Sequence, residues 1–340
     1  MAHIPKDLNS FKEIVGQVFD NYDPGKDVNR TLKAYLIESN IKTPPLMEGY
    51  SDWNQLGGSW SICSRNDNFF VLNKGKGRIW TIFTLSSVDI SDNTIEKWTR
   101  NSGLDRCWFS GDYLQKFGEK NNWIERGLGI KYSNSLLPKD EGMHFSLKAW
   151  HGVDVDDDIK QLFLKAKEKF TTTSVRWRSY KDSNVNMKSE WYNDGKITIQ
   201  YSDSVSELFS YIFQLNESYE NSLKKAEEYR NQNKGAFEFV FDCKIDIEKY
   251  SKALNDGKSS LKLWMLETYS EEDFKRFSGI DLHTGDRVLL DMGDNYAYMT
   301  IPGKGCVNAT PRFLTISGEN ALGHVKAYYE GSEIFNEPNF

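Results

Sequence analysis

The chain alternates between two hydrophobic periods, and this feature limits the folds it can adopt more than any other. Segments with a period of two flank glycine-rich turns, as in residues 69–72 and 78–85 around the turn at 73–77. Segments with helical spacing stand between such hairpins, without the regular strand–helix–strand order of a parallel sheet. We therefore predict an α+β fold of mainly antiparallel sheets with packed helices.

The longest predicted helix covers about residues 203–232. Its apolar positions recur at helical spacing from Val205 to Ala226, and Asp203 is placed to cap its first turn. Shorter helices are predicted over 7–20, 31–39, 92–100, 111–120, 156–170 and 271–277. Strands are predicted over 123–132, 143–150, 174–180, 187–192, 196–201, 236–247, 260–267, 287–292, 296–301, 313–317 and 324–329.

A length of 340 residues predicts about two packed units. We place their boundary near residues 152–158. The first unit, residues 1–152, would combine a helical N-terminus with a β-rich α+β body. The second, residues 153–340, would be an α+β unit with the long helix at 203–232 and a β-rich C-terminus.

The chain is rich in aromatic residues, with 10 Trp, 17 Tyr and 20 Phe. This content excludes a disordered chain and supplies large rings for a core. Four tryptophans stand in or beside loop-like segments that contain glycine: Trp53, Trp60, Trp108 and Trp123. Exposed rings of this kind stack on bases or clamp a partner, although burial in the core is the commoner fate.

The formal net charge is −6, so any site for a polyanion must be a local basic patch. The four cysteines, Cys63, Cys107, Cys243 and Cys306, are too scattered for a CxxC zinc pair and indicate reduced thiols. No apolar leader or membrane span stands out in the sequence. We therefore expect a soluble cytoplasmic protein that has no contact with a membrane.

One local basic stretch lies between residues 160 and 181. We select five of its residues as a phosphate-binding or nucleic-acid-binding edge: Lys165, Lys169, Arg176, Arg178 and Lys181. Arg176 and Arg178 are two apart on a predicted strand, so both guanidinium groups face one side. The alternative is a solvated helix end, because acidic residues at a helix start and basic ones at its end complement the helix dipole.

Two short motifs are weak candidates for catalysis. Asp242 and Lys244 end an apolar strand, where a metal-dependent nuclease places a metal-binding acid and a lysine; the sequence shows no second acid nearby. His144, with Ser146 on the same predicted strand, suits acid–base work on a phosphodiester, but a second such motif is lacking.

Three further patterns favour structural interpretations. The acidic run at residues 154–158 fits a helix start better than a calcium loop. The segment 303–306 lacks the spacing of a phosphate-binding loop. A Cys306 nucleophile with His283 or His324 is conceivable, but nothing in the sequence lowers the pKa of its thiol. We predict no metal and no cofactor.

The sequence leaves three functional hypotheses open, and with them the question whether the protein is an enzyme. The first is a recognition protein that binds a nucleic acid, a nucleotide or a protein partner through aromatic and basic residues. The second is a phosphodiester hydrolase that uses Asp242 and Lys244, or His144. The third is a non-catalytic subunit of a larger assembly, whose aromatic excess would serve protein–protein interaction.

Overall fold

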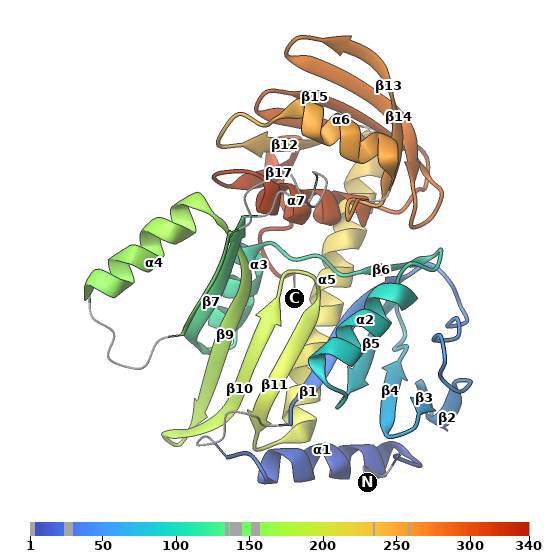
Figure 1. The fold of residues 1–340 in the computed structure, drawn as a ribbon, viewed down its shortest axis with the longest axis vertical. Helices are drawn as coiled ribbons and strands as arrows, with labels where there is room; N and C mark the ends of the chain where they lie inside the picture. The colour runs from blue at the N-terminus through green and yellow to red at the C-terminus, as the bar shows by residue number, and fades with distance from the viewer. Residues whose placement is uncertain are drawn as a thin grey trace.

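A computed structural model describes residues 4–23, 30–132, 136, 145–150, 157–233, 235–257 and 259–339. In these residues eighteen strands form two antiparallel sheets, and seven helices pack around them (Figure 1). The α+β prediction is therefore confirmed. No helix in these ranges is both long and apolar enough to cross a membrane.

The first sheet has eleven strands and is built around β1, Leu32–Ser39, which pairs with β5 on one side and β11 on the other. Its strand order is β2-β3-β4-β5-β1-β11-β10-β9-β7-β8, and β6 adds to one end of β1. The other bounds are β2 Asn54–Gly57, β3 Trp60–Arg65, β4 Asn68–Asn73, β5 Ile79–Thr84, β6 Leu104–Arg106, β7 Ile124–Tyr132, β8 Phe145–Trp150, β9 Thr171–Lys181, β10 Asn184–Tyr192 and β11 Lys196–Ser202.

The second sheet has seven strands and lies above the first in Figure 1. Its order is β13-β14-β15-β16-β12-β17-β18. The bounds are β12 Phe237–Phe241, β13 Leu263–Glu271, β14 Phe274–Asp281, β15 Arg287–Gly293, β16 Tyr296–Thr300, β17 Val325–Tyr329 and β18 Ser332–Ile334. Two helices pack with this sheet, α6 Ile247–Asp256 against β13 and α7 Ala309–Asn320 against β17.

Helix α5, Val205–Asn233, is the predicted long helix, and it contacts both sheets (Figure 1). Its first half packs Phe209 against Phe83 of β5, with ring centroids 4.7 Å apart. Its second half stacks Tyr229 on Tyr329 of β17 at 5.7 Å. The other helices are α1 Leu8–Asp20, α2 Val88–Trp98, α3 Gly111–Lys120 and α4 Asp157–Lys169.

Three predicted elements were wrong, two because burial hid the period and one because strand pairing decided the structure. The segment at 31–39 is strand β1, whose eight residues are all buried, so apolar residues need not alternate. The segment at 313–317 lies in α7, which is buried on every side over most of its length and shows no polar face. The segment at 271–277 covers the end of β13, the turn and the first half of β14, since strand pairing overrides local helix preference there.

The predicted unit boundary falls at residues 152–158, of which 152–156 lie outside the described residues. Strands β8 and β9, on either side of it, both pair with β7. One sheet thus continues across this position, and the passage from the first sheet to the second coincides with α5.

The four loop tryptophans pack inward. Trp60 and Trp123 are buried in the main core, Trp108 packs against that core, and the half-buried Trp53 donates its indole N–H to the Pro45 carbonyl at 2.9 Å. All four cysteines are unpaired, as predicted; Cys243 is exposed and the other three are buried.

Candidate functional site

Part of one face of the first sheet carries no helix among the described residues. It belongs to β8–β11, beside the region of β1 and β5 that α2 covers (Figure 1). Cations and aromatic rings gather on it, and we call it the cationic sheet face. Its members are Lys148, Trp150, Arg176, Arg178, Lys188, Tyr192 and Lys196.

Gly127 of β7, the strand between β8 and β9, allows Trp150 and Arg176 to meet. Arg176 of β9 and Trp150 of β8 both pair with Gly127 of β7, so they share one face across that position. A Cβ atom on Gly127 would lie 2.6 Å from the Trp150 ring. Because glycine leaves this space free, the guanidinium carbon of Arg176 lies over the Trp150 ring, 4.3 Å from its centroid.

The pattern of cation over ring repeats across the face. The Lys148 and Lys196 ammonium groups lie 4.9 and 5.3 Å from the centroid of Tyr192. Lys188 lies 4.8 Å from the centroid of Tyr22, which follows α1. Rings and positive charges therefore alternate over β8, β9, β10 and β11 and their border.

Most of the positive charge on this face is not neutralised. Arg176, Arg178 and Lys188 form no ion pair with any carboxylate of the described residues. The buried Glu190 binds Lys148 at 3.1 Å instead. Burial lowers the pKa of the Arg176 guanidinium, against the opposing effect of Glu190, and an anionic ligand would offset that cost.

A pH prediction arises beside this face at Lys33, whose ammonium donates to the Ser86 carbonyl at 2.6 Å. Burial, and then the charge of Lys196, lower the pKa of Lys33 from 10.5 to about 8. Between these two values only the unfolded chain holds the proton, so wild-type stability rises relative to Lys33→Met as pH increases, by at most about 1.4 kcal/mol per pH unit. Urea denaturation at pH 7 to 10 measures this; a constant difference between the two proteins would contradict it.

The structure divides the five predicted basic residues. Arg176 and Arg178 lie on the cationic sheet face, and Lys181 is exposed at the hairpin end of β9. Lys165 and Lys169 are exposed on α4, which lies on the other side of the sheet. Lys167 of α4 binds Glu125, which pairs with the inward-facing Trp177.

In the described part of the chain, the predicted catalytic residues do not lie beside the groups that their proposed chemistry requires. The exposed Asp242 accepts the backbone N–H of His324 at 3.0 Å, and the exposed Lys244 pairs with Asp294. His144 lies outside the described residues, as do Asp154 and Asp156. The one described group of three or more metal-binding side chains lies elsewhere.

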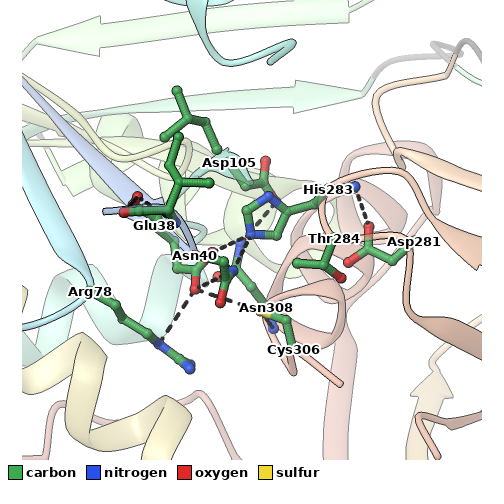
Figure 2. Close-up of polar contacts among 12 residues, drawn as sticks. Glu38, Asn40, Arg78, Asp105, Asp281, His283, Thr284, Cys306 and Asn308 are labelled. Carbon is green, nitrogen blue, oxygen red and sulfur yellow. Dashed lines mark hydrogen bonds and ion pairs between the residues drawn. The ribbon is translucent and has the colours of Figure 1, made fainter. Parts of the chain in front are cut away.

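That group is a buried cluster of Glu38, His283 and Cys306 (Figure 2). The Glu38 carboxylate accepts from Asn40, and one of its oxygens lies 3.6 Å from the Cys306 sulfur. The other oxygen contacts His283 Nε2. Sequence reasoning paired Cys306 with His283 but missed Glu38, because nothing in a continuously buried strand distinguishes one functional carboxylate.

The cluster does not favour a nucleophilic Cys306. Burial, and then the charge of Glu38, raise the pKa of this thiol well above its usual value, although Arg78 acts in the opposite direction. A thiol attacks as the thiolate. Cys306 in the protein alone is therefore a poor nucleophile.

A buried ion network lies next to the cluster. Arg312 bonds to Asp105 of β6 and to Asp281 at the end of β14, and all three side chains are buried. Burial alone would raise the pKa of Asp105, but Lys262 and Arg312 lower it below its usual range. The network thus joins the two sheets through α7.

Comparisons with known proteins give a family but no activity. A family model described as MJECL33-like protein matches residues 8–317. A protein of Methanocaldococcus jannaschii, named uncharacterized protein MJECL33, is 22% identical over 370 aligned positions, covering 90% of this chain and 87% of its own. No solved structure matches the chain.

Proposed function

Since the chain belongs to the MJECL33-like protein family, whose description states no activity, we propose from the geometry that it binds single-stranded nucleic acid. The observation that supports this proposal is the cationic sheet face, a part of a sheet that no described helix covers, on which cations alternate with aromatic rings.

Charge supports the proposal first. The whole chain carries a formal charge of −6, yet Arg176, Arg178 and Lys188 form no ion pair with described carboxylates. Cations that follow neighbouring strands suit the regularly spaced phosphates of a polynucleotide. Arginine also binds phosphate in a bidentate manner.

The aromatic side chains support a single strand rather than a duplex. Trp150 is 45% exposed and Tyr180, beside Arg178 on β9, is 36% exposed. Unpaired bases stack on such rings, and each stacked base contributes about 1–3 kcal/mol. The bases of a duplex are already stacked and offer a side chain no free face.

Binding is favoured over cleavage. Asp242 and Lys244 directly follow β12 of the second sheet, away from the cationic sheet face on the first, and no second acid joins Asp242 in a described metal-binding group. A nuclease of this type needs such an acid to hold its metal ions. A protein partner for the same face is the outcome to consider if nucleic acid does not bind.

The test is the affinity for labelled single-stranded RNA and DNA at two salt concentrations. The double variant Arg176→Glu, Arg178→Glu should lose at least about tenfold in affinity at low salt, and the log–log salt slope should fall by about 1.4, or 0.7 for each lost phosphate contact. Trp150→Ala should weaken binding by about 1–3 kcal/mol with little change in that slope, because stacking carries no charge.

The matched control is Lys165→Glu, Lys169→Glu, which makes the same charge change on the exposed surface of α4. This variant should bind nearly as wild type does. If the two double variants lost affinity equally, net charge alone would explain the loss. That outcome would contradict a binding site on the cationic sheet face. Failure of the wild-type protein to bind either strand at low salt would contradict the function itself.

A further inference from the structure

We infer that Glu38, His283 and Cys306 form a binding site for a divalent transition-metal ion, with Zn²⁺ as the best fit. This inference is independent of nucleic-acid binding. The three donors come from β1, from the loop after β14 and from the segment before α7, and they point toward one another (Figure 2). Their side chains are buried, so bulk water does not compete with them for a bound ion.

The donor set and its dimensions suit zinc. A carboxylate, an imidazole and a thiolate are the three ligand types that this ion takes in proteins. The ligand atoms all lie within 4.8 Å of one another, and Glu38 Oε1 is 3.6 Å from Cys306 Sγ. A tetrahedral ion with bonds of about 2.0 Å to oxygen and 2.3 Å to sulfur separates these atoms by about 3.5 Å.

Hydrogen bonding without an ion is unsatisfactory at His283 Nε2. This atom touches a Glu38 oxygen and also lies 2.8 Å from Asn40 Nδ2. The Asn40 amide lies 3.0 and 3.1 Å from the two Glu38 oxygens, so it must present its donor there. If Nε2 carries a proton, two hydrogen-bond donors, Nε2–H and the Asn40 amide, face each other. If Nε2 carries none, two acceptors, Nε2 and the Glu38 carboxylate, face each other.

Other assignments of hydrogen do not remove the conflict. If the Asn40 amide were turned around, its oxygen would face both Glu38 oxygens. A proton on Glu38 would satisfy Nε2 but would give up the ion pair between Glu38 Oε1 and Arg78 Nε, which lie 3.4 Å apart. A cation resolves the conflict, because the Glu38 carboxylate and a bare imidazole nitrogen both donate electron pairs to it and neither then needs a proton.

The surroundings supply an entrance. Asn40 and Arg78 line an open surface pocket of ≈ 430 Å³, together with Lys42, Lys74 and Trp80. On their inner side, Asn40 and Arg78 both contact Glu38, one of the three donors. Displacement of the Asn40 and Arg78 side chains would open a path from this pocket to the donors, as a filled interior site requires.

The experiment uses the full chain without a purification tag, loaded with Co²⁺ or Zn²⁺ and then desalted. We expect about one ion per chain, and with Co²⁺ a sulfur-to-metal absorption band, because Cys306 would bind as thiolate. Cys306→Ser should lose the band and most of the metal. Cys243→Ser, which removes the exposed thiol, should keep both.

Two further measurements keep the test decisive if Cys306→Ser does not fold. Zn²⁺ should raise the thermal midpoint of the wild-type protein, since an ion that binds only the folded chain stabilises it. Asn40→Ala, which leaves all three ligands in place, should weaken metal affinity by about 10–100-fold. Loaded wild-type protein without bound metal, or with Co²⁺ but no sulfur band, would overturn the inference, as would equal losses in the two cysteine variants.

Discussion

Replacing Arg312 with methionine should lower the free energy of unfolding by about 3–5 kcal/mol, the usual cost of removing one partner from a buried ion pair. Arg312 is fully buried, bonds to Asp105 and Asp281, and donates through Nε to the Leu261 carbonyl at 2.7 Å. Methionine fills much of the space but leaves the buried Asp281 without its arginine and leaves Asp105 with Lys262 alone. Chemical denaturation at pH 7 measures the loss.

The control for this prediction is Arg276→Met. Arg276 makes two bonds to Asp291, at 2.8 and 2.9 Å, but it is 56% exposed. Solvent screens such a pair, and its loss should cost at most about 1 kcal/mol. Similar costs for the two arginines would mean that the buried network does not hold the sheets together.

The same comparison has a pH dependence with a definite sign. Because the folded-state pKa of Asp105 lies below its usual value, the wild-type network contributes stability above about pH 4 and loses it as pH falls further. In Arg312→Met, protonation of Asp105 instead relieves part of the loss of the Arg312 charge. The difference between the two proteins should therefore shrink below about pH 4.

The second large effect is expected at Phe209 of α5. Phe209→Ala should destabilise the protein by about 3–5 kcal/mol, because it removes a buried ring and leaves a cavity. The ring is 3% exposed and packs against Phe83, Trp60 and Phe11, with centroids 4.7, 5.9 and 6.1 Å away. Chemical denaturation again gives the value.

Gln214→Ala on the exposed side of the same helix is its control. An exposed substitution in a helix changes stability by only about 0.5 kcal/mol. A denaturation midpoint of Phe209→Ala equal to that of the control would contradict a central role of α5 in packing.

Hydrophobic periodicity correctly predicted the elements that have one solvent-exposed side and one buried side. Helix α5 and the hairpin around Gly195 fall where expected, because solvent contact imposes a regular pattern on them. Strand β1 and helix α7 were mistaken because both are buried nearly all round. In a fully buried segment, apolar residues suit a helix and a strand equally well. The structure is therefore decided by contacts with segments that are distant in the sequence.

The candidate sites divide in the same way. That Arg176 and Arg178 share a face follows from strand alternation alone. Trp150 could not be assigned to them, since only the register across Gly127 brings it there. Glu38 is 245 residues from His283 and 268 from Cys306, and no local pattern links residues so far apart.

The position of β1 has a consequence for biosynthesis. β5 closes one side of β1 after some fifty further residues, and β6 covers Ile37–Ser39 on the other side, but β11, the partner of Leu32–Tyr35 there, ends at Ser202. At a ribosomal rate of about 5–20 residues per second, the open edge waits for roughly ten to thirty seconds. An unpaired apolar edge recruits other chains during such a delay. The nascent polypeptide is therefore most exposed to aggregation, and most dependent on chaperones, before β11 leaves the ribosome.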